Sequence, residues 1–391
     1  MPQRLPPKPS QPAAFSIPVT PLGFTAPGAI YLGQRNSLAS LDFLDENRLL
    51  FTFRVPGLLH RGAESAEQDE LRQIRAVVLA LPAGIIQSEA LWTLHDRTRY
   101  LWMLRDGHFL LRDREIIQQG DATLELKPLL RFPGPLTWME LDPSQQFLVT
   151  DSHEPATVEA KPGDVPSPET ASAEMIENAQ TSDRQKEIVV RILRRESGQV
   201  MLLSRTRTSV HVPINSDGYL ECLRGEGIQW TLTLNDFTGG SRVLGRVDSA
   251  CMPTLGFVSQ KEVLATTCDP SGGRRMVAMN VEGHRLWQDA NASVPIWPLL
   301  VRSPDGSRLA RESLAVTHPV SASAPLDSDD IKGQLVEVFD AATGQVALTA
   351  TASPVLDAGG NVAISPSGRR VAVISDGAIQ VFELPAPPPV P

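Results

Sequence analysis

The stretch VRSPDGSRLARES, residues 301–313, places a Ser-Pro-Asp-Gly turn between two short apolar runs. Pro304 presets φ for a turn, Asp305 can hydrogen-bond to nearby backbone, and the following glycine tolerates positive φ. Weaker echoes occur at residues 141–152 (LDPSQQFLVTDS) and 364–375 (ISPSGRRVAVIS). We therefore interpret the turn as a structural element that is repeated along the chain and carries no chemistry of its own.

Short runs rich in Val, Ile, Leu, Thr and aromatic residues surround these turns. Most of the runs end at Gly, Pro, Asn or Asp, which is the pattern of β-strands. Examples are RLLFTFRV (48–55), EIVVRIL (187–193), LVEVFD (335–340) and IQVFEL (379–384). The best helical candidate, AESAEQDELRQI (63–74), could form a turn or two of helix within a loop. The pattern predicts an all-β protein.

The turn-bearing elements recur with a period that indicates the type of β fold. Where no insertion intervenes, the spacing is about 45 residues, which is the length of one four-stranded propeller blade. The two longest steps contain insertions rich in Pro, Glu and Ser. We therefore predict a single seven-bladed β-propeller with four-stranded blades. The reference positions of the seven repeats are Leu41, Leu94, Leu141, Val212, Phe257, Val301 and Ile364.

The last repeat ends after its third strand, which would leave a sheet edge exposed. We expect the N-terminal run AAFSIPVTPLGF (13–24) to supply the missing outer strand and so close the ring. The predicted boundaries are a proline-rich tail at 1–13, a propeller at 14–385 with inserted loops at 153–185 and 318–333, and a second proline-rich tail at 386–391.

Composition restricts the classes of partner. The chain has 391 residues and a formal net charge of −9, which disfavours binding to nucleic acid or to an anionic membrane. It has no apolar run long enough to span a bilayer, so we expect no membrane insertion. No signal peptide is visible, so the location is cytoplasmic by default, or exported if a leader has been removed. We expect a monomer.

Residues that could carry chemistry form no recognised motif. The seven histidines are scattered without HxH or HExxH spacing, so we predict no metal site, and the DPSGG run at 269–273 falls short of a calcium loop. No nucleophile elbow, P-loop or dinucleotide fingerprint occurs, so we predict no catalytic residue and no cofactor. The histidines are His60, His95, His108, His153, His211, His284 and His318.

The cysteines and tryptophans have structural interpretations. Cys222, Cys251 and Cys268 are best interpreted as small buried hydrophobic residues, and a Cys251–Cys268 disulfide is the alternative, which would leave Cys222 as an odd thiol. For the six tryptophans, packing between blades is favoured over ligand stacking on a rim. They are Trp92, Trp102, Trp138, Trp230, Trp287 and Trp297.

The long insertions point to one face of the ring. In the repeat register, residues 56–72, 153–185 and 318–333 all lie between the second and third strands of a blade. These connections share a face with the links between blades, whereas turns of the Ser-Pro-Asp-Gly type lie on the opposite face. Loops on a rigid scaffold often carry recognition, although neutral insertion is also tolerated. We predict that partners bind on the face with the insertions.

The segments SPDGSRLA (303–310), VEVFDAATGQV (336–346) and SPSGRRVAVISDGAIQVFEL (365–384) resemble blades of WD40-like and YVTN-like bacterial β-propeller proteins. The nearest counterparts of the Trp-Asp dipeptide are Phe339-Asp340 and Phe382-Glu383, and the lone Gly-His pair at 283–284 is misplaced for a true WD40 blade.

The resemblance implies a non-catalytic binding or scaffold protein that recognises a protein or peptide. The alternative is a propeller enzyme or small-ligand binder, lactonase-like or quinoprotein-like, that uses the central channel. The enzyme would require several inward polar residues that converge at one channel mouth.

Overall fold

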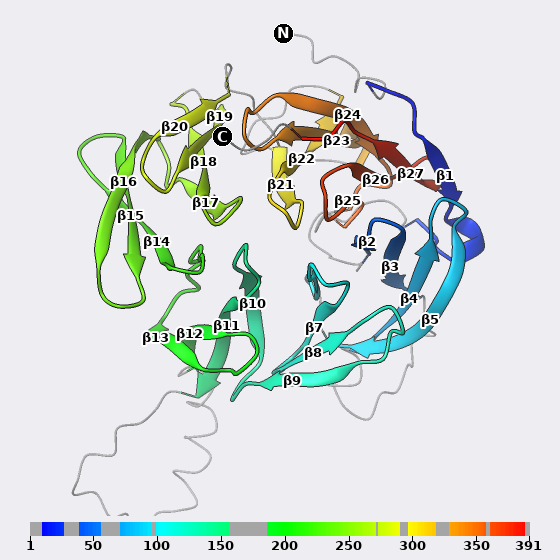
Figure 1. Ribbon diagram of the computed structural model, residues 1–391, viewed down its shortest axis with the longest axis horizontal. Helices are drawn as coiled ribbons and strands as arrows, with labels where there is room; N and C mark the ends of the chain where they lie inside the picture. Colours follow the sequence, from blue (N-terminus) through cyan, green and yellow to red (C-terminus); the bar gives the residue numbers. More distant parts are fainter. Residues whose placement is uncertain are drawn as a thin grey trace, which may run out of the picture.

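In the computed structural model, the described residues form seven antiparallel sheets that follow one another around a ring, as predicted (Figure 1). The described part of the chain contains short 3-10 helices but no α-helix. It therefore has no helix that is long and apolar enough to cross a membrane. The structure describes residues 10–26, 39–55, 71–95, 99–155, 186–270, 273–289, 296–317, 328–356 and 360–387.

Blades 1 to 3 each contain four strands in chain order from the ring axis outwards. Blade 1 comprises β2 (Ser40–Asp45), β3 (Arg48–Arg54), β4 (Arg72–Ala80) and β5 (Ile85–Leu94). Blade 2 comprises β6 (Leu101–Met103), β7 (Phe109–Asp113), β8 (Ile116–Gly120) and β9 (Lys127–Arg131). Blade 3 comprises β10 (Leu136–Leu141), β11 (Phe147–Pro155), β12 (Lys186–Arg194) and β13 (Val200–Thr206).

Blades 4 to 6 continue the ring. Blade 4 comprises β14 (Gly218–Arg224), β15 (Gln229–Asp236) and β16 (Ser241–Asp248). Blade 5 comprises β17 (Thr254–Phe257), β18 (Glu262–Cys268), β19 (Arg274–Asn280) and β20 (Arg285–Gln288). Blade 6 comprises β21 (Ile296–Arg302), β22 (Arg308–Val316), β23 (Ile331–Asp340) and β24 (Val346–Ala352).

Blade 4 differs from the prediction because it has three strands instead of four. The expected inner strand is reduced to one bridge between Ile214 and Tyr219. Pro213 has no backbone N–H to donate, and the Asn215 side chain accepts from the N–H groups of Asp217 and Gly218. This local turn takes the place of a strand ladder.

The two ends of the chain close the ring in blade 7, as predicted. β1 (Phe15–Pro18) pairs with β27 (Ala378–Glu383), beside β26 (Arg370–Ser375) and β25 (Val362–Ile364) (Figure 1). A short 3-10 helix, η1 (Thr20–Leu22), follows β1. The side chains that this segment buries in the core are those of Ile17, Val19, Leu22 and Phe24.

The turn at Ser303–Gly306 has the expected chemistry. The hydroxyl of Ser303 donates to Asp305 Oδ1 at 2.6 Å, and the same oxygen accepts from the N–H of Ser307 at 2.9 Å. Gly306 has a φ of +78°, and a Cβ there would meet the carbonyl oxygen of Val258 at 2.8 Å. Only glycine fits both conditions.

Several predicted loop and tail residues are ordered parts of the sheets. Residues 153–155 end β11 and residues 331–333 begin β23, so both strands extend into the segments predicted as insertions. Arg72–Ile74, from the possible helix, begin β4 instead. Most residues of the three insertions and of the two tails lie outside the described residues.

The start of the described chain covers a sheet edge. The backbone N–H of Ser10 donates to the carbonyl oxygen of Thr349 in β24 at 2.9 Å, and the Ser10 hydroxyl accepts from the N–H of Thr349. An edge strand presents unpaired backbone groups, so this contact protects part of β24. The segment predicted as a proline-rich tail therefore includes residues held against the ring, since Gln11 also donates to the carbonyl oxygen of Glu383 in β27.

Apolar side chains fill most of the space between adjacent blades, and one buried carboxyl group lies among them between blades 6 and 7. Glu312 of β22 is fully buried, pairs with Val336, and shares its face with Ala310 in the apolar cluster between blades 6 and 7. Neither carboxylate oxygen has a hydrogen-bond partner within the described residues. Burial raises the pKa of Glu312 to about 8.

Candidate interaction face

One end of the ring, here called the loop face, carries the connections between second and third strands and the links between blades. The opposite end, the hairpin face, carries turns such as Ser303–Gly306. The chain leaves blades 1, 3 and 6 after β3, β11 and β22 and returns as β4, β12 and β23, so the three insertions begin and end on the loop face. The loop-face ends of blades 3, 4 and 5 carry the best-defined candidate features.

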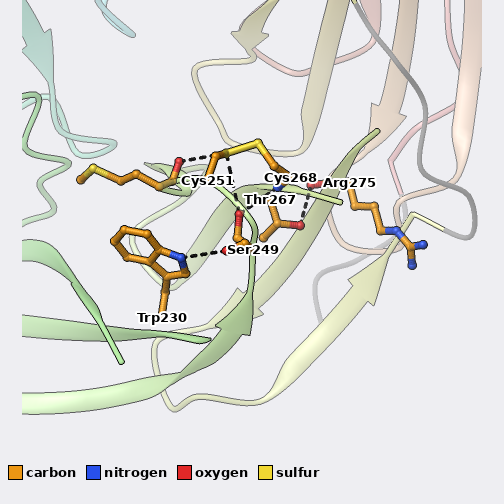
Figure 2. Close-up of a disulfide and its surroundings, with 7 residues drawn as sticks. Trp230, Ser249, Cys251, Thr267, Cys268 and Arg275 are labelled. Carbon is orange, nitrogen blue, oxygen red and sulfur yellow. Dashed lines mark hydrogen bonds between the residues drawn. A yellow bond between two sulfur atoms is a disulfide. The ribbon is translucent and has the colours of Figure 1, made fainter. Parts of the chain in front are cut away.

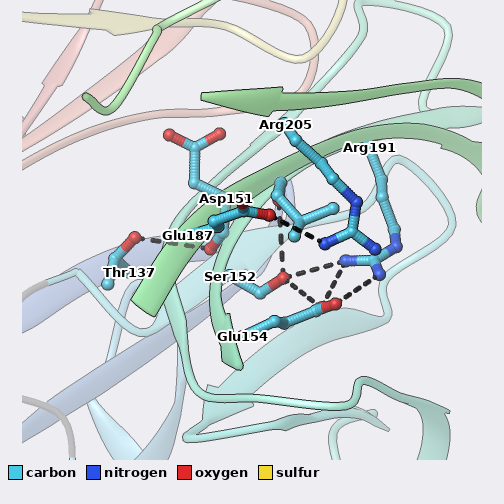
Figure 3. Close-up of polar contacts among 8 residues, drawn as sticks. Thr137, Asp151, Ser152, Glu154, Glu187, Arg191 and Arg205 are labelled. Atoms are coloured by element: carbon cyan, nitrogen blue, oxygen red, sulfur yellow. Dashed lines mark hydrogen bonds and ion pairs between the residues drawn. The ribbon is translucent and has the colours of Figure 1, made fainter. Parts of the chain in front are cut away.

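A buried ion pair fixes the base of the insertion in blade 3 (Figure 3). Arg191 of β12 binds Glu154 of β11 with both ends of its guanidinium, at 2.6 and 2.9 Å. Ser152 donates to Glu154 and accepts from Arg191. Burial opposes ionisation of Glu154, but the hydrogen bonds from Arg191 and Ser152 outweigh it and hold the pKa below its usual range. The two strands that lead into the insertion are therefore clamped together.

Asp151 lies beside this clamp (Figure 3). It also holds the link between blades 3 and 4. Its Oδ2 accepts a hydrogen bond from Ser209 at 2.5 Å, and its Oδ1 has no partner within the described residues. Burial raises the pKa of Asp151, while Ser209, His211 and His153 act in the opposite direction. The ring of His211 stacks on Trp138 at 4.5 Å. The link is thus anchored by hydrogen bonds from Ser209 and the backbone of Val210 to Asp151 and by one stacked pair.

The link between blades 4 and 5 is anchored by a disulfide between Cys251 and Cys268, so the favoured interpretation of these two cysteines was wrong (Figure 2). Cys268 ends β18, and the link crosses the end of that strand, which brings the sulfur atoms together. Ser249 supports the corner because its carbonyl oxygen accepts from the indole of Trp230 and its hydroxyl accepts from the N–H of Cys268. Cys222 is a free thiol.

Large apolar side chains are exposed around this disulfide. Leu223 at the end of β14 is 52% exposed, Ile228 in the following turn is 46% exposed, and Met252 next to Cys251 is 66% exposed. Ile228 and the disulfide-linked corner are connected because the N–H of Ser249 donates to the carbonyl oxygen of Ile228. We call Leu223, Ile228 and Met252 the apolar rim. It stands on backbone that the disulfide holds in place.

Charged residues from four blades meet at the ring axis. Arg99 lies within electrostatic reach of Asp42, Glu140 and Arg302. These residues come from blades 1, 2, 3 and 6, so they can approach one another only across the axis. Loss of hydration raises the pKa of Asp42 to about 6, against a hydrogen bond from Ser40 and the charge of Arg99. In contrast to Asp42, Arg99 is exposed to solvent, and its guanidinium lies over the ring of Trp102.

Hydrogen bonds cross the axis on the hairpin face. Arg302, at the end of β21, donates to the carbonyl oxygens of Leu141 in blade 3 and Phe257 in blade 5. Gln260 of blade 5 donates to Asp142 of blade 3. Arg105 of blade 2 donates to the carbonyl oxygen of Pro304 in blade 6 at 2.8 Å. Three of these bonds join the hairpin ends of non-adjacent blades, so the hairpin face is tied together across the axis.

The remaining histidines do not gather into a site. His95 contacts Asp113, His108 contacts Asp106, and His284 contacts Asn280. His60 and His318 lie outside the described residues. In the part of the chain that the structure describes, no group of three or more His, Cys, Asp or Glu residues could hold a metal ion.

The sequence did not reveal the charged axis residues or the clamp in blade 3. Asp42, Glu140 and Arg302 lie on innermost strands, and Arg99 precedes one. An alignment of the innermost strands was therefore the way in which the sequence could have revealed these four charged residues. The clamp residues Ser152 and Glu154 alternate along β11, a pattern shared by many exposed strands.

No protein-family model matches the chain, and no curated protein matches it. Among solved structures, the WD40 domain of Toxoplasma gondii coronin is similar, with 9% identity and a TM-score of 0.51 over 98% of this chain and 88% of that chain. Pyrococcus horikoshii acylaminoacyl peptidase aligns with 8% identity and a TM-score of 0.49 over 90% of this chain and 52% of the peptidase. These likenesses concern the propeller fold alone.

Proposed function

We propose that the chain is a non-catalytic binding platform that holds a protein or peptide on its loop face. It belongs, in this proposal, with WD40-like and YVTN-like bacterial propellers that lack the Trp-Asp and Gly-His signatures. It acts as a monomer, without nucleic acid or membrane insertion.

The apolar rim is the observation that carries this proposal. Leu223, Ile228 and Met252 expose between 46% and 66% of their surface on one end of blades 4 and 5. Exposed apolar residues on a fixed backbone favour protein partners, because binding removes apolar surface from water with little ordering cost. The disulfide and the bond between Ser249 and Ile228 supply that fixed backbone.

Site-specific photo-crosslinking tests the proposal. A benzophenone side chain is placed at Ile228 or Met252 in cells that express the protein, with Val243 as the matched control position. Val243 is 61% exposed and lies on β16 of the same blade, but towards the hairpin face. The expected result is a discrete adduct from positions 228 and 252 and none from 243. Equal adducts from all three positions, or no adduct from any, would refute the platform.

The disulfide also bears on location. Disulfides persist in oxidising compartments and are rare in the reducing cytosol. We therefore propose that the protein acts outside the cytosol, in place of the cytoplasmic default. Alkylation of free thiols immediately after cell lysis should modify Cys222 alone. Modification of all three cysteines would contradict this location.

A small-ligand binder or enzyme that uses the ring axis is the second candidate. The charged group of Asp42, Arg99, Glu140 and Arg302 favours it, because inward polar residues are what such a site requires. Hydrolysis of a panel of lactones and esters tests the lactonase-like form. Turnover that is lost in Asp42→Asn, with folding intact, would favour the enzyme over the platform. If the wild type hydrolyses none of these lactones and esters, the hydrolase hypothesis is refuted.

A further inference from the structure

A cavity of about 70 Å³ lies between blades 5 and 6 at their loop-face ends. Apolar packing between these blades extends from the hairpin face as far as Met276. Beyond it, the paired residues Thr254 and Thr266 of blade 5 face the paired residues Leu300 and Arg311 of blade 6. The cavity therefore lies where the apolar packing between these two blades ends.

Arg311 supplies fixed hydrogen-bond donors in the cavity wall, with its charge balanced by Glu337 and Asp289. Its side chain is 10% exposed and is held by Glu337 at 2.7 and 3.1 Å and by Asp289 at 3.4 Å. These bonds use three of the five guanidinium N–H groups, so two remain without a partner within the described residues. The face of Phe339 lies beneath the guanidinium at 5.3 Å. Arg311 is therefore rigid but retains donors.

A second arginine stands at the rim of the same cavity. Arg274 begins β19 and shares a face with Met276 because side chains alternate along a strand. It is exposed, and its side chain has no hydrogen bond or ion pair within the described residues. No described residue that lines the cavity is acidic, whereas two threonine hydroxyl groups and three arginines are present, and the third arginine, Arg275, is paired with Asp269.

We infer that this cavity binds the carboxylate of an acidic side chain from the peptide partner. A buried water needs roughly 10–15 Å³, so the cavity has room for about five water-sized groups, which matches a glutamate side chain. Arg311 and Arg274 can donate to the carboxylate, since guanidinium–carboxylate bonds are charge-assisted. Thr254 and Thr266 add hydroxyl donors, and Met276 and Leu300 contact the methylene groups. This inference rests on the proposed platform function and specifies the chemistry of its partner.

Methyl NMR tests the inference on the full chain. The probes are N-acetyl-glutamate methylamide, its glutamine counterpart, and free glutarate. The glutamate probe should shift the methyl signals of Met276, Leu300 and Thr266, whereas the neutral glutamine probe should not. Arg274→Ala and Thr266→Val should each weaken glutamate binding at least fivefold, with unchanged thermal melting. Arg246→Ala is the matched control, because Arg246 is an exposed arginine on β16 outside the cavity.

Three outcomes would overturn the inference. Equal shifts from the glutamate and glutamine probes would show that the carboxylate is not recognised. Equal losses in Arg274→Ala and Arg246→Ala would indicate general charge attraction. Tighter binding of glutarate than of the capped glutamate would identify a free dicarboxylic acid as the ligand. If crosslinking at Ile228 persists while the glutamate probe fails, the platform stands and the acidic pocket alone is refuted.

Discussion

Replacing Glu312 by glutamine tests whether this carboxyl group is protonated in the folded protein. Glu312 is 0% exposed, and neither of its oxygens has a hydrogen-bond partner within the described residues. A buried charge without a partner is unfavourable, so the folded chain keeps the proton and the pKa rises from 4.5 to about 8. Glutamine retains the shape of the protonated acid and removes the titration.

The magnitude follows from this difference in pKa. Between pH 4.5 and pH 8 the folded protein holds a proton that the unfolded chain releases, so the free energy of unfolding falls as pH rises. Each pH unit lowers the free energy of unfolding of the wild type by about 1.4 kcal/mol, and the full interval of about three and a half units lowers it by about 5 kcal/mol. Wild type and Glu312→Gln should therefore be nearly equal at pH 4.5, and the variant should be more stable by about 3 kcal/mol at pH 7.

Urea unfolding followed by tryptophan fluorescence, at one-unit steps from pH 5 to pH 8, measures this difference. Comparing two chains at each pH cancels the contribution of other titrating groups, including Asp42. Glu226→Gln is the matched control, since Glu226 is exposed and its replacement removes a charge without changing the core. Parallel stability curves for wild type and Glu312→Gln would show that Glu312 is ionised or hydrated in the folded state, and the reasoning would fail.

Three further predictions concern the elements that hold the ring together. Deleting residues 1–25 removes β1 and four buried apolar side chains, so the free energy of unfolding should fall by about 6 kcal/mol or more. Deleting residues 1–9 is the control and should have little effect. Equal melting temperatures of the two truncated chains would contradict closure by β1. The double variant Cys251→Ser/Cys268→Ser opens a loop with a sequence separation of 17 and should lose about 3 kcal/mol in guanidinium unfolding, and reductant should lower the wild type to the same value. Arg191→Met leaves Glu154 buried without its partner and should cost about 3–5 kcal/mol, most of which Arg191→Met/Glu154→Met should recover; an equally unstable double variant would show that packing, and not charge, is responsible.

The ring was predictable because its signals are local and repeated. The turn at Ser303–Gly306 and the period of about 45 residues describe one blade at a time, and closure followed from an incomplete last repeat. Blade 4 departed from the pattern because Pro213 and Asn215 form a turn where an apolar run suggested a strand. The choice between a turn and a strand depends here on the hydrogen bonds of the Asn215 side chain, and hydrophobic periodicity does not reveal such bonds.

The candidate sites were harder to predict because they form between blades. Cys251 and Cys268 meet only because the link between blades 4 and 5 crosses the end of β18. The cavity near Arg311 is lined by residues of two blades, and no spacing in the sequence reports the distance between sheets. The position of the loop face could be predicted, whereas the particular residues on it required coordinates.

The pairing of β1 with β27 has a consequence for synthesis. Phe15 and its partner Val381 are separated in the chain by all of blades 1 to 6, so blade 7 cannot form until these six blades have been synthesised. Until then Ile17 of β1 has no partner strand, and blades 1 and 6 each present an uncovered face. Ring closure is therefore a late, all-or-none event, and a translation product that stops before β27 should be recognised by chaperones and proteases as unfolded.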